Sequence, residues 1–261
     1  MTSSGVRLLG AADVPAFLNL VDLDPAVNVF AAHRARLTQL EPRWLGGEVW
    51  GRFIHNELVS ALHIGANLVP VGFSEVDPDD DVRAYLEPAL QRHRSVATIV
   101  GRDYAVASLW RALEPRWGKA REVRPSQPHL EISSAPLVEP HPLVRATHAE
   151  EIDLVYPACV AMYTEEVGLS PEVGGGADLY RARVAQLIAR GWQFSLIERG
   201  EVVFEVEVAC SSPRAAQIQG VYTVPHRRGE GLASAGMAAV VNLVRREIAG
   251  TVSLYVNDFN H

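Results

Sequence analysis

The stretch from Gly220 to Gly250 constrains the fold of this chain more than any other part of it. An apolar, β-prone run reaches Pro225, and proline cannot donate a hydrogen bond to a sheet, so the pattern predicts a strand that stops at about Val224. From Leu232 onward, apolar residues recur at the spacing of one buried helical face. The stretch therefore predicts a strand, a short turn and a helix that ends near Gly250, where glycine is a suitable left-handed cap.

The turn between this strand and this helix is suited to binding an anion. Its glycines, Gly229 and Gly231, allow a tight backbone turn with exposed N–H groups. The helix behind them adds N–H groups that have no partner within the helix, together with the positive end of its dipole. We therefore expect backbone groups of this turn to hold a pyrophosphate. A tight connection without a ligand is the alternative interpretation of the two glycines.

These residues resemble the central signature of the GNAT superfamily of acetyl-CoA-dependent N-acetyltransferases, Gln/Arg-x-x-Gly-x-Gly/Ala. The segment Arg228-Gly229-Glu230-Gly231-Leu232-Ala233 matches it, and a proline stands three residues before the arginine, as is common in that family. The run from Thr251 to Val256, with the polar residues after it, is similar to the family's fifth strand and the asparagine that follows. In order, these features cover about forty residues of the chain.

The resemblance implies which residues hold acetyl-CoA. In GNAT folds the fourth and fifth strands splay apart, and backbone groups of the fourth strand bind pantetheine and donate to the thioester carbonyl. Here these groups would belong to Val221, Tyr222 and Thr223. The residues that would wrap the pyrophosphate, mainly through backbone N–H groups, are Arg228, Gly229, Glu230, Gly231, Leu232, Ala233 and Ser234. Asn260 matches the family asparagine that often meets the cofactor.

The sequence does not assign the catalytic residues. The family tyrosine that protonates the leaving thiolate would lie beyond His261, so we expect either that the polypeptide continues or that a partner covers an open sheet edge. Glu207 is a weak candidate for the base. It shares one face of a predicted strand with Glu205, and we expect both glutamates to be solvated.

The first half of the chain echoes the second. Val6-Arg7 with Asp13 parallels Val144-Arg145 with Glu151, and a hairpin pattern follows two helix patterns in each half. An unduplicated α+β chain is the alternative. We predict an α/β fold with α+β mixed sheets, arranged as two tandem GNAT-like acyl-CoA N-acyltransferase domains. These are a degenerate domain at residues 1–124, a proline-rich linker at 125–142 and an acetyl-CoA-binding domain at 143–261.

The first domain is expected to be degenerate because an acidic run, Ser74 to Asp79, stands where the second domain has its glycine turn. Such a run would repel a pyrophosphate. At the start of the second domain, Thr147 and Glu150 have the spacing of a capping box and predict a helix N-terminus.

Composition and charge exclude several functions. The net charge of −7 argues against nucleic-acid binding and suits a cationic amine. Cys159 and Cys210 form neither a metal-ligand pattern nor a disulfide framework, and the histidines lack ligand spacing, so we expect no metal. Without a signal-peptide pattern or an apolar run of about 20 residues, we expect a cytoplasmic protein with no membrane contact.

Together these features predict an enzyme, an N-acetyltransferase that moves an acetyl group from acetyl-CoA to a small-molecule or peptide amine through a ternary complex. A non-catalytic, acetyl-CoA-binding regulatory module is one alternative. A dinucleotide-binding domain is another, because Gly229-x-Gly231 after a strand also resembles the Rossmann fingerprint, although Ser234 stands at its third glycine. The sequence sets neither the acceptor nor the oligomeric state.

Overall fold

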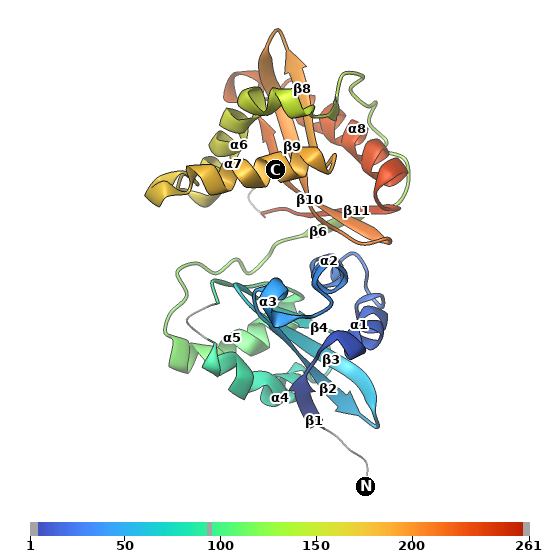
Figure 1. Ribbon diagram of the computed structural model, residues 1–261, viewed down its shortest axis with the longest axis vertical. Helices are drawn as coiled ribbons and strands as arrows, with labels where there is room; N and C mark the ends of the chain where they lie inside the picture. Colours follow the sequence, from blue (N-terminus) through green and yellow to red (C-terminus); the bar gives the residue numbers. More distant parts are fainter. Residues whose placement is uncertain (1–4, 93–95, 258–261) are drawn as a thin grey trace. The chain divides into compact units, whose positions relative to one another are not determined.

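The computed structural model describes residues 5–92 and 96–257. Contacts within the chain divide it into two compact units. Unit 1 contains residues 5–92, 96–128 and 256–257, and unit 2 is His129–Tyr255. In each unit, helices cover both faces of one sheet (Figure 1). The segment 125–142, which we expected to be a linker, is thus shared between the units, and part of it is a strand of unit 2.

Unit 1 is built on a five-stranded sheet in the order β1-β2-β3-β4-β5, in which only β4 and β5 run parallel. The strands are β1 (Gly5–Leu8), β2 (Glu48–Ile54), β3 (Glu57–Ile64), β4 (Asn67–Val71) and β5 (Thr98–Ile99). The helices are α1 (Val14–Val21), α2 (Val29–Thr38), α3 (Pro42–Leu45), α4 (Pro78–Gln91) and α5 (Asp103–Trp117). One hydrophobic cluster joins the sheet to α1 and α2, and another joins it to α4 and α5.

Unit 2 repeats this topology and adds a strand. Its strands are β6 (His129–Ile132), β7 (Arg145–Ala146), β8 (Gln193–Glu198), β9 (Glu201–Ser211), β10 (Ala215–Thr223) and β11 (Thr251–Tyr255). Its helices are α6 (Ile152–Val167), α7 (Ala177–Ala189) and α8 (Leu232–Glu247). From β7 to β11 the order and the directions match those from β1 to β5, with one parallel pair at β10 and β11. The predicted duplication is therefore present in the topology of the sheets.

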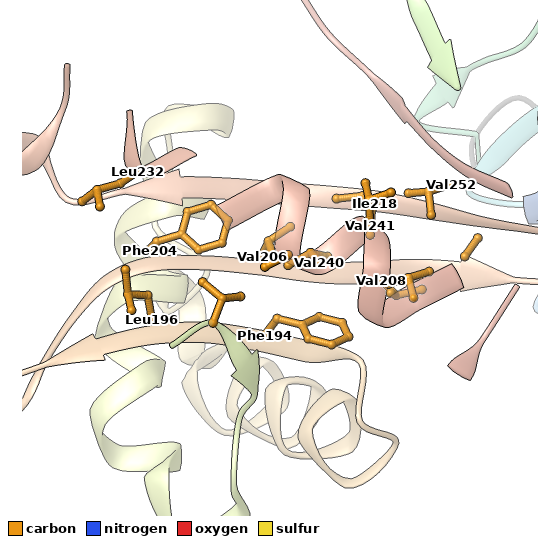
Figure 2. Close-up of a cluster of buried hydrophobic side chains, with 14 of the residues drawn as sticks. Phe194, Leu196, Phe204, Val206, Val208, Ile218, Leu232, Val240, Val241 and Val252 are labelled. Carbon is orange, nitrogen blue, oxygen red and sulfur yellow. The ribbon is translucent and has the colours of Figure 1, made fainter. Parts of the chain in front are cut away.

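The main core of unit 2 lies between its sheet and α8 (Figure 2). Phe204, Val206 and Val208 alternate along β9 on the face that packs against this helix. A Cβ atom at Gly236 of α8 would lie 2.7 Å from the ring of Phe204, so the helix approaches the strand at a position that only glycine fits. This packing confirms the buried face predicted from the helical spacing at Val240, Val241 and Val244.

Each unit also has an ion pair of the same kind near its first strand. Arg7 donates to both carboxylate oxygens of Asp13, at 2.8 and 2.6 Å, and Arg145 donates to Glu151 at the same two distances. In each unit the carboxylate also accepts the backbone N–H three residues before it. The predicted capping box is therefore wrong by one position, since Glu151 rather than Glu150 makes this contact.

The predicted open edge at β11 is also wrong. Strand β6 pairs antiparallel with β11, from Ile132 opposite Val252 to His129 opposite Tyr255. It comes from the proline-spaced segment at 125–142. The chain itself thus covers this edge of the sheet.

Candidate functional site

Strands β10 and β11 separate along most of the length of β10. Their parallel pairing covers Ala215, Ala216 and Gln217 of β10, whereas β10 continues to Thr223. Beyond Gln217, the described residues of β11 do not pair with it. Backbone groups on that edge of β10 are therefore available to a ligand.

A bulge interrupts β10 near its end. Gln219 lies opposite Glu207 and Tyr222 lies opposite Glu205, so β10 uses one more residue than β9 over this interval. Gly220 accommodates the extra residue with φ of +64°, and a Cβ atom there would lie 2.7 Å from the Cε atom of Met162 in α6. The bulge takes the following backbone out of the regular ladder.

The turn that follows carries the predicted glycines in the conformation expected of them. Gly229 and Gly231 have φ of +81° and +79°, and a Cβ atom on either would meet nothing within 4 Å. Glycine is thus required here by backbone conformation rather than by crowding. Gly231 is the N-cap of α8, with no side-chain cap and no acidic residue in the first turn. The N-terminal amides of α8 are therefore open to an external anion.

Arg228 joins the end of β10 to the end of α6. Its Nε atom donates to the carbonyl of Thr223 at 3.0 Å, and its guanidinium pairs with Glu165 at 2.7 Å and lies 5.6 Å from the ring centroid of Tyr222. The hydrogen bond to Glu165 raises the pKa of Arg228, although some desolvation opposes it. Its backbone N–H donates to Pro225 at 3.3 Å, so Arg228 holds the turn in place.

The predicted cofactor residues that the structure describes lie at the end of β10 and in the segment that leads into α8. Residues 221–223 end β10, and residues 228–234 form the turn and the first turn of α8. The side chain of Tyr222 is largely buried, and this burial raises its pKa. Asn260 lies outside the described residues.

Glu205 and Glu207 are buried, with 0% and 1% of their surface exposed, so the expectation that they are solvated is wrong. Helices α6 and α7 cover this face of the sheet, which the strand pattern alone could not reveal. The carboxylate of Glu207 accepts two hydrogen bonds from Arg183 of α7, one of them at 3.0 Å, and another from Gln219. Glu207 is thus fully engaged by its neighbours.

Glu205 has no such cation on its own carboxylate. Its Oε2 atom accepts from Gln193 at 2.6 Å and from the Cys159 thiol at 3.7 Å, whereas its buried Oε1 atom has no hydrogen-bond partner among the described residues. Burial, and then the charge of Glu207, raise the pKa of Glu205 to about 8. Glu205 therefore carries a proton at neutral pH. The sequence signal for this group was that polar and apolar residues alternate along both β8 and β9.

In the described part of the chain, none of the helices combines the length and apolar character needed to span a membrane. Over the same residues, no group of three or more His, Cys, Asp or Glu side chains is placed to hold a metal ion.

Comparison with solved structures gives matches over the whole chain. A GCN5-related N-acetyltransferase from Sphaerobacter thermophilus is 16% identical with a TM-score of 0.57, covering 99% of this chain and 88% of the other. A tandem GNAT protein from the clavulanic acid biosynthesis pathway is 16% identical with a TM-score of 0.53, covering 99% and 91%. A GNAT-family acetyltransferase from Colwellia psychrerythraea is 13% identical with a TM-score of 0.50, covering 98% and 90%.

The chain has the tandem GNAT fold. This confirms the predicted fold class and its duplication. By sequence, a family described as a domain of unknown function (DUF4081) matches residues 47–155, and no curated protein matches. The chain spans only 27% of a GCN5-related N-acetyltransferase from Kribbella flavida. At these identities the comparisons establish the GNAT fold and leave the reaction to be argued from the site.

Proposed function

We propose that unit 2 is an acetyl-CoA-dependent N-acetyltransferase domain. The observation that carries this proposal is the uncapped N-terminus of α8, which lies directly behind Gly229 and Gly231 and follows the free edge of β10. Backbone amides at a helix N-terminus bind phosphate groups well, because they add donors to the positive end of the dipole. A thioester cofactor with a diphosphate fits both parts of this surface.

In this proposal the amides of residues 229–234 bind the diphosphate, and the edge of β10 from Val221 to Thr223 binds the pantetheine arm. Arg228 positions the turn, since its side chain and its own N–H are engaged within the protein. The predicted contact of Asn260 remains part of the proposal.

The reaction joins the acceptor nitrogen to the thioester carbonyl carbon and breaks the carbon–sulfur bond. The proton lost by the amine ends on the thiolate of CoA. The bulge at Gly220 exposes backbone groups that can donate to the oxyanion of the tetrahedral intermediate, and the protein holds both reactants in place. Glu207 is a poor candidate for the base because Arg183 and Gln219 already occupy its carboxylate. The acceptor is a small-molecule or peptide amine, consistent with the net charge of −7.

One observation favours a second function, an acetyl-CoA-binding module without turnover. Both carboxylates opposite the bulge are buried, and they are either paired or protonated. Neither is in a state to take a proton from an ammonium group at neutral pH. Binding and turnover therefore need separate measurements.

The test is calorimetric and thermal titration with acetyl-CoA, with NAD as the matched control ligand. A ligand at 100 times its dissociation constant stabilises the protein by about 2.7 kcal/mol, so acetyl-CoA should raise the melting temperature and NAD should not. Release of CoA thiol is then measured with a panel of amines. Release with at least one amine supports the transferase, whereas binding without release supports the module. A shift with NAD alone would refute both.

A further inference from the structure

Unit 1 contains the same frame as the candidate site. Helix α4 follows β4 as α8 follows β10, and the parallel pairing of β4 with β5 stops after Leu68, although β4 continues to Val71. The parallel strands therefore separate beside a helix N-terminus in this unit too. The two frames differ in what their N-termini contact.

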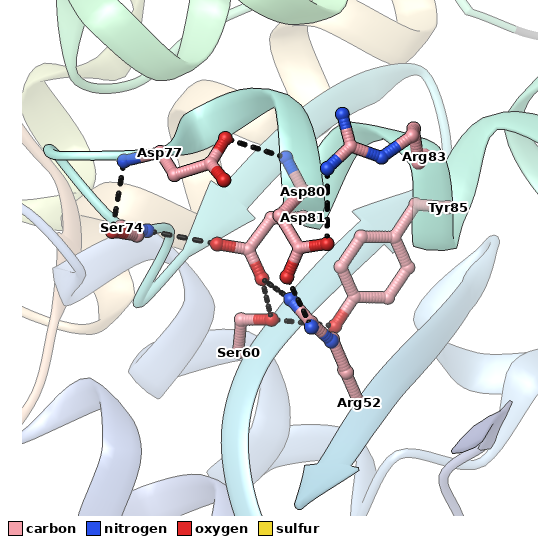
Figure 3. Close-up of polar contacts among 8 residues, drawn as sticks. All are labelled: Arg52, Ser60, Ser74, Asp77, Asp80, Asp81, Arg83 and Tyr85. Atoms are coloured by element: carbon pink, nitrogen blue, oxygen red, sulfur yellow. Dashed lines mark hydrogen bonds and ion pairs between the residues drawn. The ribbon is translucent and has the colours of Figure 1, made fainter. Parts of the chain in front are cut away.

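The N-terminus of α4 is capped by the chain's own carboxylates (Figure 3). Asp77 is the N-cap, and its side chain accepts the N–H of Asp80 at 3.1 Å. The first turn is also acidic, with residues 79–81 all aspartate. By contrast, α8 has Gly231 as N-cap and no acidic residue in its first turn.

Asp81 of α4 is buried among donors from β2, β3 and the turn after β4. Only 3% of its surface is exposed. It accepts the N–H of Ser74, in the turn after β4, at 2.8 Å, the hydroxyl of Ser60 at 2.6 Å and the guanidinium of Arg52 at 3.0 Å. Arg52 also pairs with Asp80 (Figure 3). A turn amide, a hydroxyl and an arginine thus surround a negative group that belongs to the protein.

An incoming diphosphate would find these donors engaged. To reach them it would displace Asp81 from a buried ion pair, which is strongly unfavourable because it leaves an uncompensated buried charge. It would also stand beside the carboxylates of Asp77 and Asp80, which repel it. Occupied donors, rather than a missing frame, therefore keep an anion away from α4.

We propose that unit 1 is a self-filled anion site, with Asp77 and Asp81 in the place of the anion, and that it binds no acyl-CoA. The statement that unit 1 does not admit an anion follows from the contacts within unit 1. The further statement that each chain takes a single acyl-CoA, in unit 2, rests on the proposed function.

The test follows backbone amide signals by NMR during titration with inorganic pyrophosphate and, separately, with CoA. We expect the amides of residues 229–234 to shift and those of Ser74 and Asp80 to stay in place, with one CoA bound per chain by calorimetry. Shifts at Ser74 and Asp80, or two CoA molecules per chain, would overturn the proposal. If no amide of either unit shifts, the proposed function fails while the closure of unit 1 stands.

A pair of variants tests what the cap does. Asp77→Ala removes the capping oxygen, whereas Asp77→Asn keeps one and removes the charge. We expect Asp77→Ala to lower the melting temperature by about 2–4 °C, Asp77→Asn to lower it less, and the CoA dissociation constant to change less than about twofold in both. A tenfold weaker affinity for CoA in either folded variant would show that unit 1 takes part in binding.

Discussion

The two units share one topology and differ in what they bury beneath their first pair of helices. Under α1 and α2, unit 1 buries the apolar side chains of Ala61, Val69 and Val71. Under α6 and α7, unit 2 buries Glu205 and Glu207 with the amide side chain of Gln193. The N-caps differ in the same sense, since unit 1 satisfies its helix N-terminus internally and unit 2 does not.

Unsatisfied polar groups cost stability, so the open amides at the N-terminus of α8 support the ligand proposed for unit 2. Unit 1 is not free of such groups, because the Nε2 atom of His63 is buried without a partner among the described residues. Burial lowers the pKa of His63 to about 4, so it stays neutral and brings no charge into the core. The two units thus differ in their helix N-termini: the amides of α4 are capped within unit 1, whereas those of α8 have no side-chain cap.

The largest expected effect comes from giving the first turn of α8 an acidic residue, as the first turn of α4 has. Ser234 is exposed and is the third residue of α8, the position that Asp80 holds in α4. In Ser234→Asp the new carboxylate favours the helix dipole but repels the diphosphate. We expect acetyl-CoA affinity to fall on the order of 100-fold by calorimetry, with an unchanged or higher melting temperature.

Ser234→Asn is the matched control, because it has nearly the same size and no charge. Its affinity should stay within about threefold of the wild type, since only the charge opposes the diphosphate. Equal affinities of the Asp and Asn variants would place the diphosphate elsewhere.

A second prediction concerns the proton on Glu205. Its pKa is about 8 in the folded protein and near 4.5 in the unfolded chain. Between these values the folded state holds a proton that the unfolded state has lost, so stability falls as the pH rises and levels off above about 8. This loss of stability is at most about 1.4 kcal/mol per pH unit. We expect Glu205→Gln to remove it, while the new amide oxygen still accepts the hydrogen bond from Gln193.

The measurement is urea unfolding of unit 2 signals at several pH values from 5 to 8.5, with Glu131→Gln as control. Glu131 is an exposed glutamate on β6 of the same unit, so its replacement controls for the loss of one carboxylate. If the Glu205→Gln slope equals that of the wild type, Glu205 is not the group that holds the proton.

A structural feature could be predicted from the sequence when its physical cause lies in the residues that form it. Pro225, Gly229 and Gly231 act through their own backbone, so the strand, the turn and the start of α8 were predictable residue by residue. The burial of Glu205 depends on helices far away in the chain, and an alternating strand pattern does not say which helices will cover it. Strand β6 is four residues long and pairs with a partner more than a hundred residues away, so no local pattern could assign this partner.

The smallest effect is expected where the units agree. Arg7→Gln and Arg145→Gln each remove a two-point ion pair that is partly exposed, so each should lower the free energy of unfolding by about 1 kcal/mol or less. The hydrogen bonds from Arg145 lower the pKa of Glu151 to about 2, so its contribution is full above the ordinary value of 4.5 and is lost as the pH falls through 2. Melting curves from pH 3 to 7 should show the Arg145→Gln effect shrinking toward low pH. A cost several times larger for one arginine than for the other would mean that the shared pair has acquired different roles in the two units.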